Sequence, residues 1–425
     1  MGEYFLLSKD GGKVPLSLPE DWTVLYFPET GGRSARTAEE LTEKCIEEPV
    51  GTSPLRELAD RSRRIVVLVD DDTRPTPVKA ALRTLLSVLE ESTSGEIVIV
   101  IALGTHEPMS EERLERRLGA EVLSKYPVIQ HDAWARDLVP LPLGGGDTVR
   151  INPHVAMADL KIGIGSCLPH PMAGFGGGPK LIVPGASDYE STKRHHMLNT
   201  IRALSMYGVC RGNPFYEGIV RAVSKVGFDF SINFVYNPLG EPVGAVAGGM
   251  PEAFEQAGEM CLTTLGFPFR ERVDVTIASS FPHLRGAQFA KGLMAPSRIT
   301  KEDGSIILFL PFEAPPPSEF FECFHLLKQR WGERVLSFVG EVMERGEAFL
   351  QGRPLEFSMA VASVLFRPPR RTIVVSDALK EEDAVAMGFE YAPSIEEAMR
   401  SLHKLFPSAK VAVIPAGGLL APVSV

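Results

Sequence analysis

The chain has 425 residues, of which 44% are hydrophobic and 23% charged, and its formal net charge is −10 at pH 7. This composition is that of a globular protein, and the length exceeds what one average hydrophobic core holds together, so we expect two domains. The negative charge argues against a nucleic-acid-binding protein, because phosphate binding needs a basic face. A small anionic substrate is still allowed, since it needs only a few local cations.

Cysteine usage and hydropathy indicate the compartment. The five cysteines, which are scattered and form no C-x-x-C pair, are Cys45, Cys167, Cys210, Cys261 and Cys323. This pattern argues against a disulfide framework and a thiolate zinc site, and it is typical of a reducing compartment. The first residues lack the features of a signal peptide, and no apolar run approaches the ~18–20 residues that span a bilayer. We therefore expect a soluble, cytoplasmic protein that does not bind membranes.

The first predicted elements alternate between buried strands and helices. A β-branched run at 65–69 predicts a strand, and a helix is expected near 78–89. A second strand at 97–103 precedes a helix that begins after Ser110, a residue type that caps helix N-termini well. Continuous apolar strands that alternate with helices indicate a parallel sheet covered on both faces.

The same alternation returns later in the chain. It predicts strands at 273–278, 306–310, 372–376 and 410–415, and helices near 189–204, 320–330, 335–345 and 395–405. Residues 213–250 alternate less regularly and favour an antiparallel segment. A boundary near 266–271 would separate an N-terminal domain, 1–268, from a C-terminal domain, 269–425. The predicted fold class is α/β, with two domains that each hold a mainly parallel sheet flanked by helices.

Two polar loops follow predicted strands, where open α/β sheets bind ligands. Residues 70–77 read Asp-Asp-Asp-Thr-Arg-Pro-Thr-Pro. This segment is either a solvated turn with Asp capping, or a site at which Arg74 forms a two-pronged pair with a carboxylate or phosphate. The second loop contains His106, which is well placed for a general base near neutral pH, although many such histidines are structural.

The segment 169–185 is the most unusual. Four glycines lie within 174–178, so that the backbone can approach a ligand closely, or the segment is simply a flexible loop. It is not a P-loop, because Leu181 follows Lys180, and Gly163-Ile-Gly165 does not continue into a dinucleotide fingerprint. A lysine held beside prolines and away from bulk water can lose its proton and react covalently.

Two further pairs are candidates for binding. His195 and His196 are adjacent in a predicted helix, where side chains point about 100° apart, so only one of them is expected to bind a given metal. No H-E-x-x-H motif is present, which removes the common zinc hydrolase class. Gln288 and Lys291 are three residues apart and share a face if helical, either as a surface pair or as part of a site.

Taken together, these segments resemble the lactate racemase family over nearly the whole chain. Five motifs match in order, which is far more specific than any one of them. They are Asp71-x-Thr73-Arg74-Pro; Gly104-Thr-His106; His170, Lys180 and His196 with separations of ten and sixteen residues; Gln288-x-x-Lys291; and the C-terminal segment from Lys410 to Gly418.

The resemblance implies a cofactor. Lys180 would covalently carry a nickel-pincer nucleotide, a pyridinium-3,5-bisthiocarboxylic acid mononucleotide that binds nickel. His196 would be the protein ligand of the nickel, and imidazole with soft donors suits such a site. Further cofactor contacts would come from Asp71, Thr73, Gly177 and Gly178. Dedicated biosynthesis proteins would supply the cofactor, and protein made without them would lack it.

The resemblance also implies a reaction. The chain would be an isomerase that racemises or epimerises a 2-hydroxy acid, lactate or a larger relative, by hydride transfer to and from the cofactor. His106 and His170 would be the two acid/bases, one for each face of the substrate. Arg74, Gln288 and Lys291 would bind the substrate.

Some segments depart from the family pattern. The family has a glycine pair and an aspartate before Gln288, whereas this chain has serines at 279 and 280 with His283 and Arg285. The glycine loop reads Gly-Gly-Gly-Pro-Lys at 176–180 rather than Ser-Gly-Gly-Arg-Lys, and a segment such as Glu356-Phe-Ser replaces a tryptophan-containing one. These differences leave the identity of the 2-hydroxy acid open, and we hypothesise that Arg285 favours a larger or more acidic substrate.

Two other functions compete with this one. A protein that binds the pincer nucleotide without turnover would need Lys180 and His196 but no paired bases, so the presence of both His106 and His170 argues against it. A divalent-metal hydrolase or lyase would use the cluster Asp70–Asp72 and would bind magnesium or zinc without an adduct on Lys180. A nicotinamide dehydrogenase is disfavoured because the fingerprint is absent.

Overall fold

The structure is a computed structural model that describes residues 4–28, 30–31, 34–202, 206–331, 340–341, 344–345, 352–366 and 371–424. Most of the helix predicted at 335–345 lies outside the described residues. Within these ranges, no helix combines the length and the apolar character that crossing a membrane requires.

A first six-stranded sheet has the order β13-β12-β9-β4-β5-β6. All neighbouring strands are parallel except β12 and β13, which are antiparallel. The strands predicted at 65–69 and 97–103 are confirmed as β4 and β5. The bounds are β4 Arg64–Val69, β5 Glu96–Ile101, β6 Val128–Gln130, β9 Leu160–Ser166, β12 Phe230–Tyr236 and β13 Pro242–Gly248.

Helices cover both faces of this sheet, because successive strand residues point to opposite sides. In β4, Ile65 and Val67 belong to a buried cluster with α1 (Ala38–Glu47), α3 (Val78–Ser92) and α9 (Glu252–Leu265). Leu68 lies in a second cluster with α8 (Pro214–Val226) and the 3-10 turn η1 (Gly178–Leu181). This burial on two sides explains why the strands are continuously apolar.

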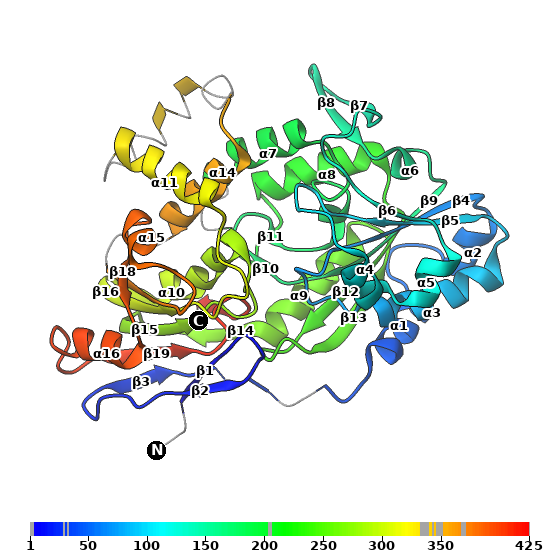
Figure 1. Ribbon diagram of the computed structural model, residues 1–425. Coiled ribbons are helices and arrows are strands. Elements are labelled where there is room, and N and C mark those ends of the chain that lie inside the picture. Colours follow the sequence, from blue (N-terminus) through cyan, green and yellow to red (C-terminus); the bar gives the residue numbers. More distant parts are fainter. Residues whose placement is uncertain are drawn as a thin grey trace.

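A second six-stranded sheet has the order β18-β17-β16-β15-β19-β3, and all its neighbouring strands are parallel. It lies beside the first sheet in the molecule (Figure 1). The four strands predicted between 273 and 415 are all present in it. The bounds are β3 Thr23–Tyr26, β15 Val273–Ser279, β16 Thr300–Phe309, β17 Thr372–Val375, β18 Glu390–Ala392 and β19 Lys410–Ile414.

The remaining elements are shorter strands and helices. The two-stranded sheets are β1 Phe5–Leu7 with β2 Lys13–Pro15, β7 Val139–Gly144 with β8 Asp147–Ile151, β10 Pro169–His170 with β11 Gly174–Phe175, and β14 Gly266–Phe269 with β20 Ala421–Ser424. The other helices are α2 Leu55–Asp60, α4 Glu111–Leu118, α5 Ala120–Lys125, α6 Pro153–Ala156, α7 Tyr189–Arg202, η2 Gly286–Leu293, α10 Met294–Ile299, α11 Ser318–Trp331, α14 Leu355–Phe366, α15 Glu381–Ala386 and α16 Ile395–His403.

The prediction for residues 213–250 is wrong in part. The segment begins with a helix, α8, and continues with β12, which pairs in parallel with β9; only the β12–β13 pair is antiparallel. The helix has a recognisable start, because Asn213 caps it through its side chain and Pro214 occupies the first turn. The hydrophobic pattern of the segment was irregular because the segment contains a helix followed by a hairpin.

The division into domains 1–268 and 269–425 remains a proposal. The first sheet lies wholly before residue 268, whereas the second includes β3, which comes from the N-terminal part of the chain and pairs with β19. Residues near the N-terminus therefore pack with the second sheet.

Gly177 offers a test of how tightly the turn before Lys180 is packed. Its φ is +76°, and an added Cβ would lie 2.5 Å from the carbonyl oxygen of Ser166. Gly212 is a matched control, since its φ is +72° and nothing lies within 4 Å of an added Cβ. We expect Gly212→Ala to lower the free energy of unfolding by about 1–2 kcal/mol through backbone strain, and Gly177→Ala by a further ~1–3 kcal/mol through the clash. Equal losses in urea unfolding would contradict this packing.

Candidate active site

Arg117 holds the loop that follows β4. From the end of α4 it donates hydrogen bonds to the carbonyl oxygens of Asp70, Arg74 and Thr76, and its guanidinium pairs with the Asp70 carboxylate. Its side chain is only 9% exposed. Burial raises the pKa of Asp70, and the positive charge of Arg117 opposes that rise. Asp70 is therefore an internal anchor of the loop.

Asp71 and His106 form a close pair. His106 Nδ1 lies 2.5 Å from Asp71 Oδ2, and Asp71 also accepts hydrogen bonds from the backbone N–H and the hydroxyl of Thr73. Burial opposes ionisation of Asp71, but the hydrogen bond and charge of His106 and the charge of Arg74 lower its pKa well below the ordinary value. A carboxylate can only accept, so Nδ1 carries a proton, and in the neutral form of the ring Nε2 then keeps its lone pair. His106 is thus arranged as a base.

The strand order explains this pairing. β4 and β5 are parallel neighbours, so the two loops at their carboxyl ends meet at one edge of the sheet. The sequence predicted that each loop follows a strand, which is confirmed, and the structure adds that the two loops lie side by side.

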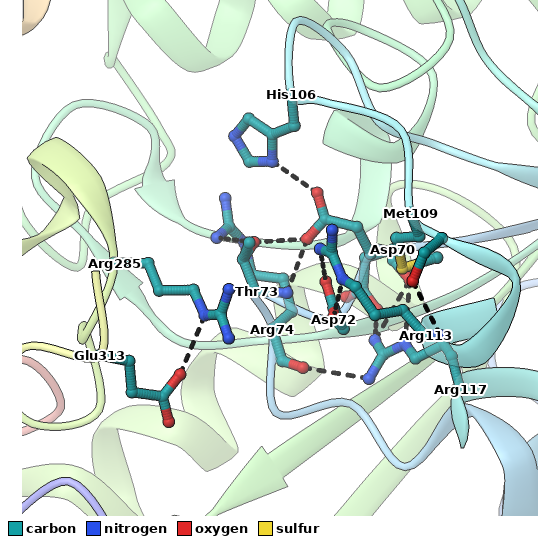
Figure 2. A network of polar contacts seen from close by, with 12 residues as sticks. Asp70, Asp72, Thr73, Arg74, His106, Met109, Arg113, Arg117, Arg285 and Glu313 are labelled. Carbon is teal, nitrogen blue, oxygen red and sulfur yellow. Dashed lines mark hydrogen bonds and ion pairs between the residues drawn. The ribbon is translucent and has the colours of Figure 1, made fainter. Parts of the chain in front are cut away.

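Asp72 points away from His106, toward α4 (Figure 2). Arg113 donates two hydrogen bonds to its carboxylate, at 2.7 Å and 2.5 Å, and this bonding lowers the pKa of Asp72. Nearby, Arg285 donates to Glu313 at 2.9 Å. The charge of Arg285 is therefore already balanced by a carboxylate.

Each carboxylate of the Asp70–Asp72 cluster thus has its own partner. Among the residues that the structure describes, no group of three or more His, Cys, Asp or Glu side chains could hold a metal ion. The cluster is a set of separate hydrogen-bonded pairs, which counts against the divalent-metal hypothesis.

Lys180 lies in the turn η1, surrounded by protein. Its Nζ is 3.3 Å from His170 Nε2 and 5.6 Å from the centre of the Phe215 ring. Burial lowers the pKa of Lys180 to about 7, helped by the positive charge of Arg74. A large fraction of this amine is therefore unprotonated near neutral pH and can act as a nucleophile.

His170 has the opposite protonation pattern to His106. Its Nδ1 accepts hydrogen bonds from the backbone N–H groups of Met172 and Ala173, at 3.2 Å and 3.1 Å. Burial, followed by the charges of Lys180 and Lys291, lowers the pKa of His170 well below its ordinary value. The neutral ring therefore carries its proton on Nε2, where it can donate to the unprotonated Lys180 amine or to a substrate oxygen.

The two histidines of α7 lie against the same phenylalanine. Their rings are inclined by 80° to each other, and both contact the Phe215 ring. His196 Nδ1 donates to the carbonyl oxygen of Thr192 at 2.9 Å, so its Nε2 keeps a lone pair. Burial and the charge of Lys180 lower the pKa of His196 to about 3, which keeps the imidazole neutral. A neutral imidazole with a fixed tautomer is a suitable metal ligand.

The second sheet contributes the segment 280–291. Gln288 and Lys291 lie in η2, and the Gln288 Oε1 atom is buried without a hydrogen-bond partner among the described residues. Burial lowers the pKa of Lys291 well below its ordinary value, and the charges of Arg74 and Lys180 lower it further. His283 donates through Nε2 to the carbonyl oxygen of Gly418 at 3.1 Å, and its pKa is also lowered, by burial and by the charges of Lys291 and Arg74.

The structure thus brings together Arg74, Lys180 and Lys291 with His170, His196 and His283.

Gly177 and Gly178 are needed for packing, since a Cβ on Gly178 would meet the Phe254 ring at 2.3 Å. The segment at Glu356 begins α14, where Ser358 contacts Thr200 of α7 through their hydroxyls, 3.1 Å apart.

Sequence reasoning missed Arg113, Arg117 and Phe215. The two arginines lie four residues apart on the helix after Ser110, so they share one face. That spacing, next to an Asp-rich loop, was the available signal. Phe215 carried no comparable signal.

The Arg117–Asp70 pair can be tested against its neighbour. Arg117→Met would leave a buried carboxylate without its cation, so we expect the free energy of unfolding to fall by about 3–5 kcal/mol. Arg116 pairs with Glu112 at the surface, with 66% of its side chain exposed, and Arg116→Met should cost less than ~1 kcal/mol. Similar losses for the two variants in urea unfolding would show that Arg117 is not an anchor.

The lowered pKa of Lys180 predicts how the reactivity of its amine changes with pH. Reductive methylation of the apo-protein with labelled formaldehyde requires the unprotonated amine. Labelling of Lys180 should rise with pH through a midpoint near 7, whereas an ordinary lysine amine stays largely protonated until about pH 10. Peptide mass spectrometry measures each site separately. A Lys180 midpoint as high as those of the surface lysines would refute a lowered pKa.

Known proteins are similar to this chain over most of its length. The lactate racemase N-terminal domain model matches residues 10–206. The chain is 28% identical to the lactate racemase of Lactiplantibacillus plantarum over 395 residues, covering 89% of each protein. It is 27% identical to the lactate racemase of Thermoanaerobacterium thermosaccharolyticum over 277 residues, which is 64% of this chain and 65%, just under two thirds, of that relative.

Two solved structures share the fold. The apoprotein structure of lactate racemase from T. thermosaccharolyticum superimposes with a TM-score of 0.85 at 24% identity, covering 99% of each chain. A crystal structure of a Thermotoga maritima protein gives a TM-score of 0.65 at 16% identity, covering 93% of this chain and all of that one. Domain match, sequence relatives and fold agree. The chain is therefore similar to the lactate racemases in its N-terminal domain, in its sequence and in its fold.

Proposed function

We propose that this chain racemises or epimerises a 2-hydroxy acid and that it carries a nickel-pincer nucleotide on Lys180. The proposal draws its reaction type from the family, whose curated relatives are named lactate racemases. The substrate, a small 2-hydroxy acid such as lactate or a larger relative, is part of the proposal.

The observation that carries the proposal is the state of Lys180. Its amine lies in a buried turn, 3.3 Å from His170, and its pKa is about 7. Such an amine is a nucleophile at neutral pH and can form a covalent bond to a carboxyl-derived group. Bond formation would also keep this position uncharged at every pH, close to Arg74 and Lys291.

The other candidate residues are suited to bind the same nickel-pincer nucleotide. His196 would be the nickel ligand, because its Nε2 has a free lone pair and Thr192 fixes its tautomer. Asp71, Thr73, Gly177 and Gly178 stay proposed as further contacts of the nucleotide. When bound, the nucleotide would supply the hydride acceptor and donor that inversion at C2 of the substrate needs.

The protein side chains would transfer the hydroxyl proton and bind the substrate carboxylate. His106 would accept the hydroxyl proton at Nε2, since Asp71 holds its Nδ1–H and stabilises the resulting positive charge. His170 would present its Nε2–H to the substrate oxygen from the face of the substrate opposite to His106. Arg74 and Lys291 would bind the substrate carboxylate, and Gln288 would satisfy its buried Oε1 with a substrate hydroxyl.

This arrangement favours the racemase over the two alternatives. A protein that only stores the nucleotide needs no base oriented by a carboxylate, and the Asp71–His106 pair is such a base. A hydrolase that binds a divalent metal at Asp70–Asp72 would first have to break the ion pairs with Arg117 and Arg113.

The experiment is to produce the chain together with the cofactor-biosynthesis proteins, which would be its partners in loading. We expect an intact-mass adduct that maps to Lys180, about one nickel per chain as for a single-ligand site, and interconversion of the enantiomers of a 2-hydroxy acid in chiral chromatography. Lys180→Ala should abolish both the adduct and the activity.

His106→Asn serves as the mechanistic variant. It should keep the adduct and the nickel while lowering kcat by about 10²–10⁴-fold, because it removes the base alone. Absence of adduct and nickel, when a known lactate racemase is loaded in parallel, would overturn the proposed function.

A further inference from the structure

A chain of buried hydrogen bonds crosses three neighbouring strands of the first sheet. The Thr76 hydroxyl lies 2.6 Å from Asp70 Oδ2 and 2.6 Å from the Ser166 hydroxyl, which lies 2.6 Å from the Tyr236 hydroxyl. All four residues are buried, and Tyr236 is fully so. Asp70 follows β4, Ser166 ends β9 and Tyr236 ends β12. None of these contacts has a role in the proposed reaction.

The direction of the chain follows from its chemistry. The Asp70 carboxylate, paired with Arg117, accepts the only hydroxyl proton of Thr76. Thr76 must then accept from Ser166, and Ser166 must accept from Tyr236. Every hydroxyl proton therefore points toward Asp70. Bonds that align in one direction polarise one another, and in a buried chain each lost member leaves a neighbour unsatisfied.

The chain joins two segments that carry the proposed bases. Thr76 belongs to the loop whose Asp71 holds His106. Ser166 is the last residue of the strand that leads into His170, and its carbonyl packs against Gly177 in the turn before Lys180. The bond from Thr76 to Ser166 is thus a direct side-chain link between the His106 segment and the segment of His170 and Lys180.

We propose that the Asp70–Thr76–Ser166–Tyr236 chain is a positioning element that fixes the Asp71–His106 pair relative to the segment of His170 and Lys180. Thr76 is its central positioning residue, because its hydroxyl bonds to both segments. The inference rests on the proposed function for the roles of the two histidines. It goes beyond that function by assigning a task to residues that touch neither substrate nor cofactor.

The first test needs no cofactor. Long-range proton–nitrogen NMR of ¹⁵N-histidine-labelled apo-protein at about pH 9, where imidazoles are neutral, reports which ring nitrogen of His106 carries the proton. We expect the Nδ1–H form in the unmodified protein. Thr76→Val should shift the His106 signals toward the Nε2–H form, because the Asp71 loop loses its link to Ser166. Thr76→Ser, which keeps the hydroxyl, should restore the original pattern.

Thr276→Val is the matched control. Thr276 is equally buried and its hydroxyl bonds to the Thr300 hydroxyl at 2.8 Å, but it lies in the second sheet. It should change stability without changing the His106 signals. His106→Gln assigns the signals.

The second test uses the nickel-loaded enzyme. Thr76→Val should lower kcat per nickel by about 10–100-fold, the effect of a small misplacement of a base, while KM for the 2-hydroxy acid should change less, because Lys291 of the second sheet still binds the carboxylate. Tyr236→Phe removes only the last donor and should have a smaller effect of the same kind.

Unchanged His106 signals in Thr76→Val, with a loss of stability like that of Thr276→Val, would overturn the inference and leave the chain a structural feature only. A failure of the proposed function would show instead as missing adduct and nickel in the unmodified protein, and the NMR comparison would still decide the role of Thr76.

Discussion

The partial burial of cationic groups close to one another is the constraint on which the site depends. Arg74, Lys180 and Lys291 lie within electrostatic reach of one another, and burial together with the positive charge of Arg74 lowers the pKa of both lysines. A guanidinium cannot give up its proton, so the lysines are the groups that lose a proton more readily than usual. The pocket thus favours two changes: conversion of the Lys180 amine into an uncharged linkage, and entry of an anion. A lysine-tethered cofactor and a carboxylate substrate would supply one change each.

The cationic and histidine side chains of the site come from separate parts of the chain. The parallel pairing of β4, β5 and β9 places the loop with Arg74, the loop with His106 and the segment with His170 and Lys180 at one edge of the first sheet. The second sheet adds Lys291 through the turn η2. Because the edge is built from loops, it needs internal supports, and the structure provides them in Arg117 and in the hydrogen bonds of Thr76.

Much of this could be predicted from the sequence, and for identifiable reasons. Apolar β-branched runs such as 65–69 identify buried strands, and the rule that ligands lie beyond strand ends marks the loops of Asp71 and His106 before any coordinates are known. Motif spacing marks Lys180 and His196. What the sequence could not show depends on tertiary contacts. The tautomer of His170 is set by the backbone N–H groups of Met172 and Ala173, and the spacing of Arg113 and Arg117 does not specify that Arg117 contacts Asp70.

The opposite protonation of the two histidines is the least expected result. In their neutral forms, His106 presents a lone pair and His170 presents a proton at Nε2, so the two proposed bases are not equivalent. The most direct measurement of the central claim is a crystal structure of the nickel-loaded protein. Our account predicts density continuous with Lys180 Nζ and nickel bonded to His196 Nε2. Nickel bound at Asp70–Asp72, or a free Lys180 amine beside a separately bound nucleotide, would contradict it.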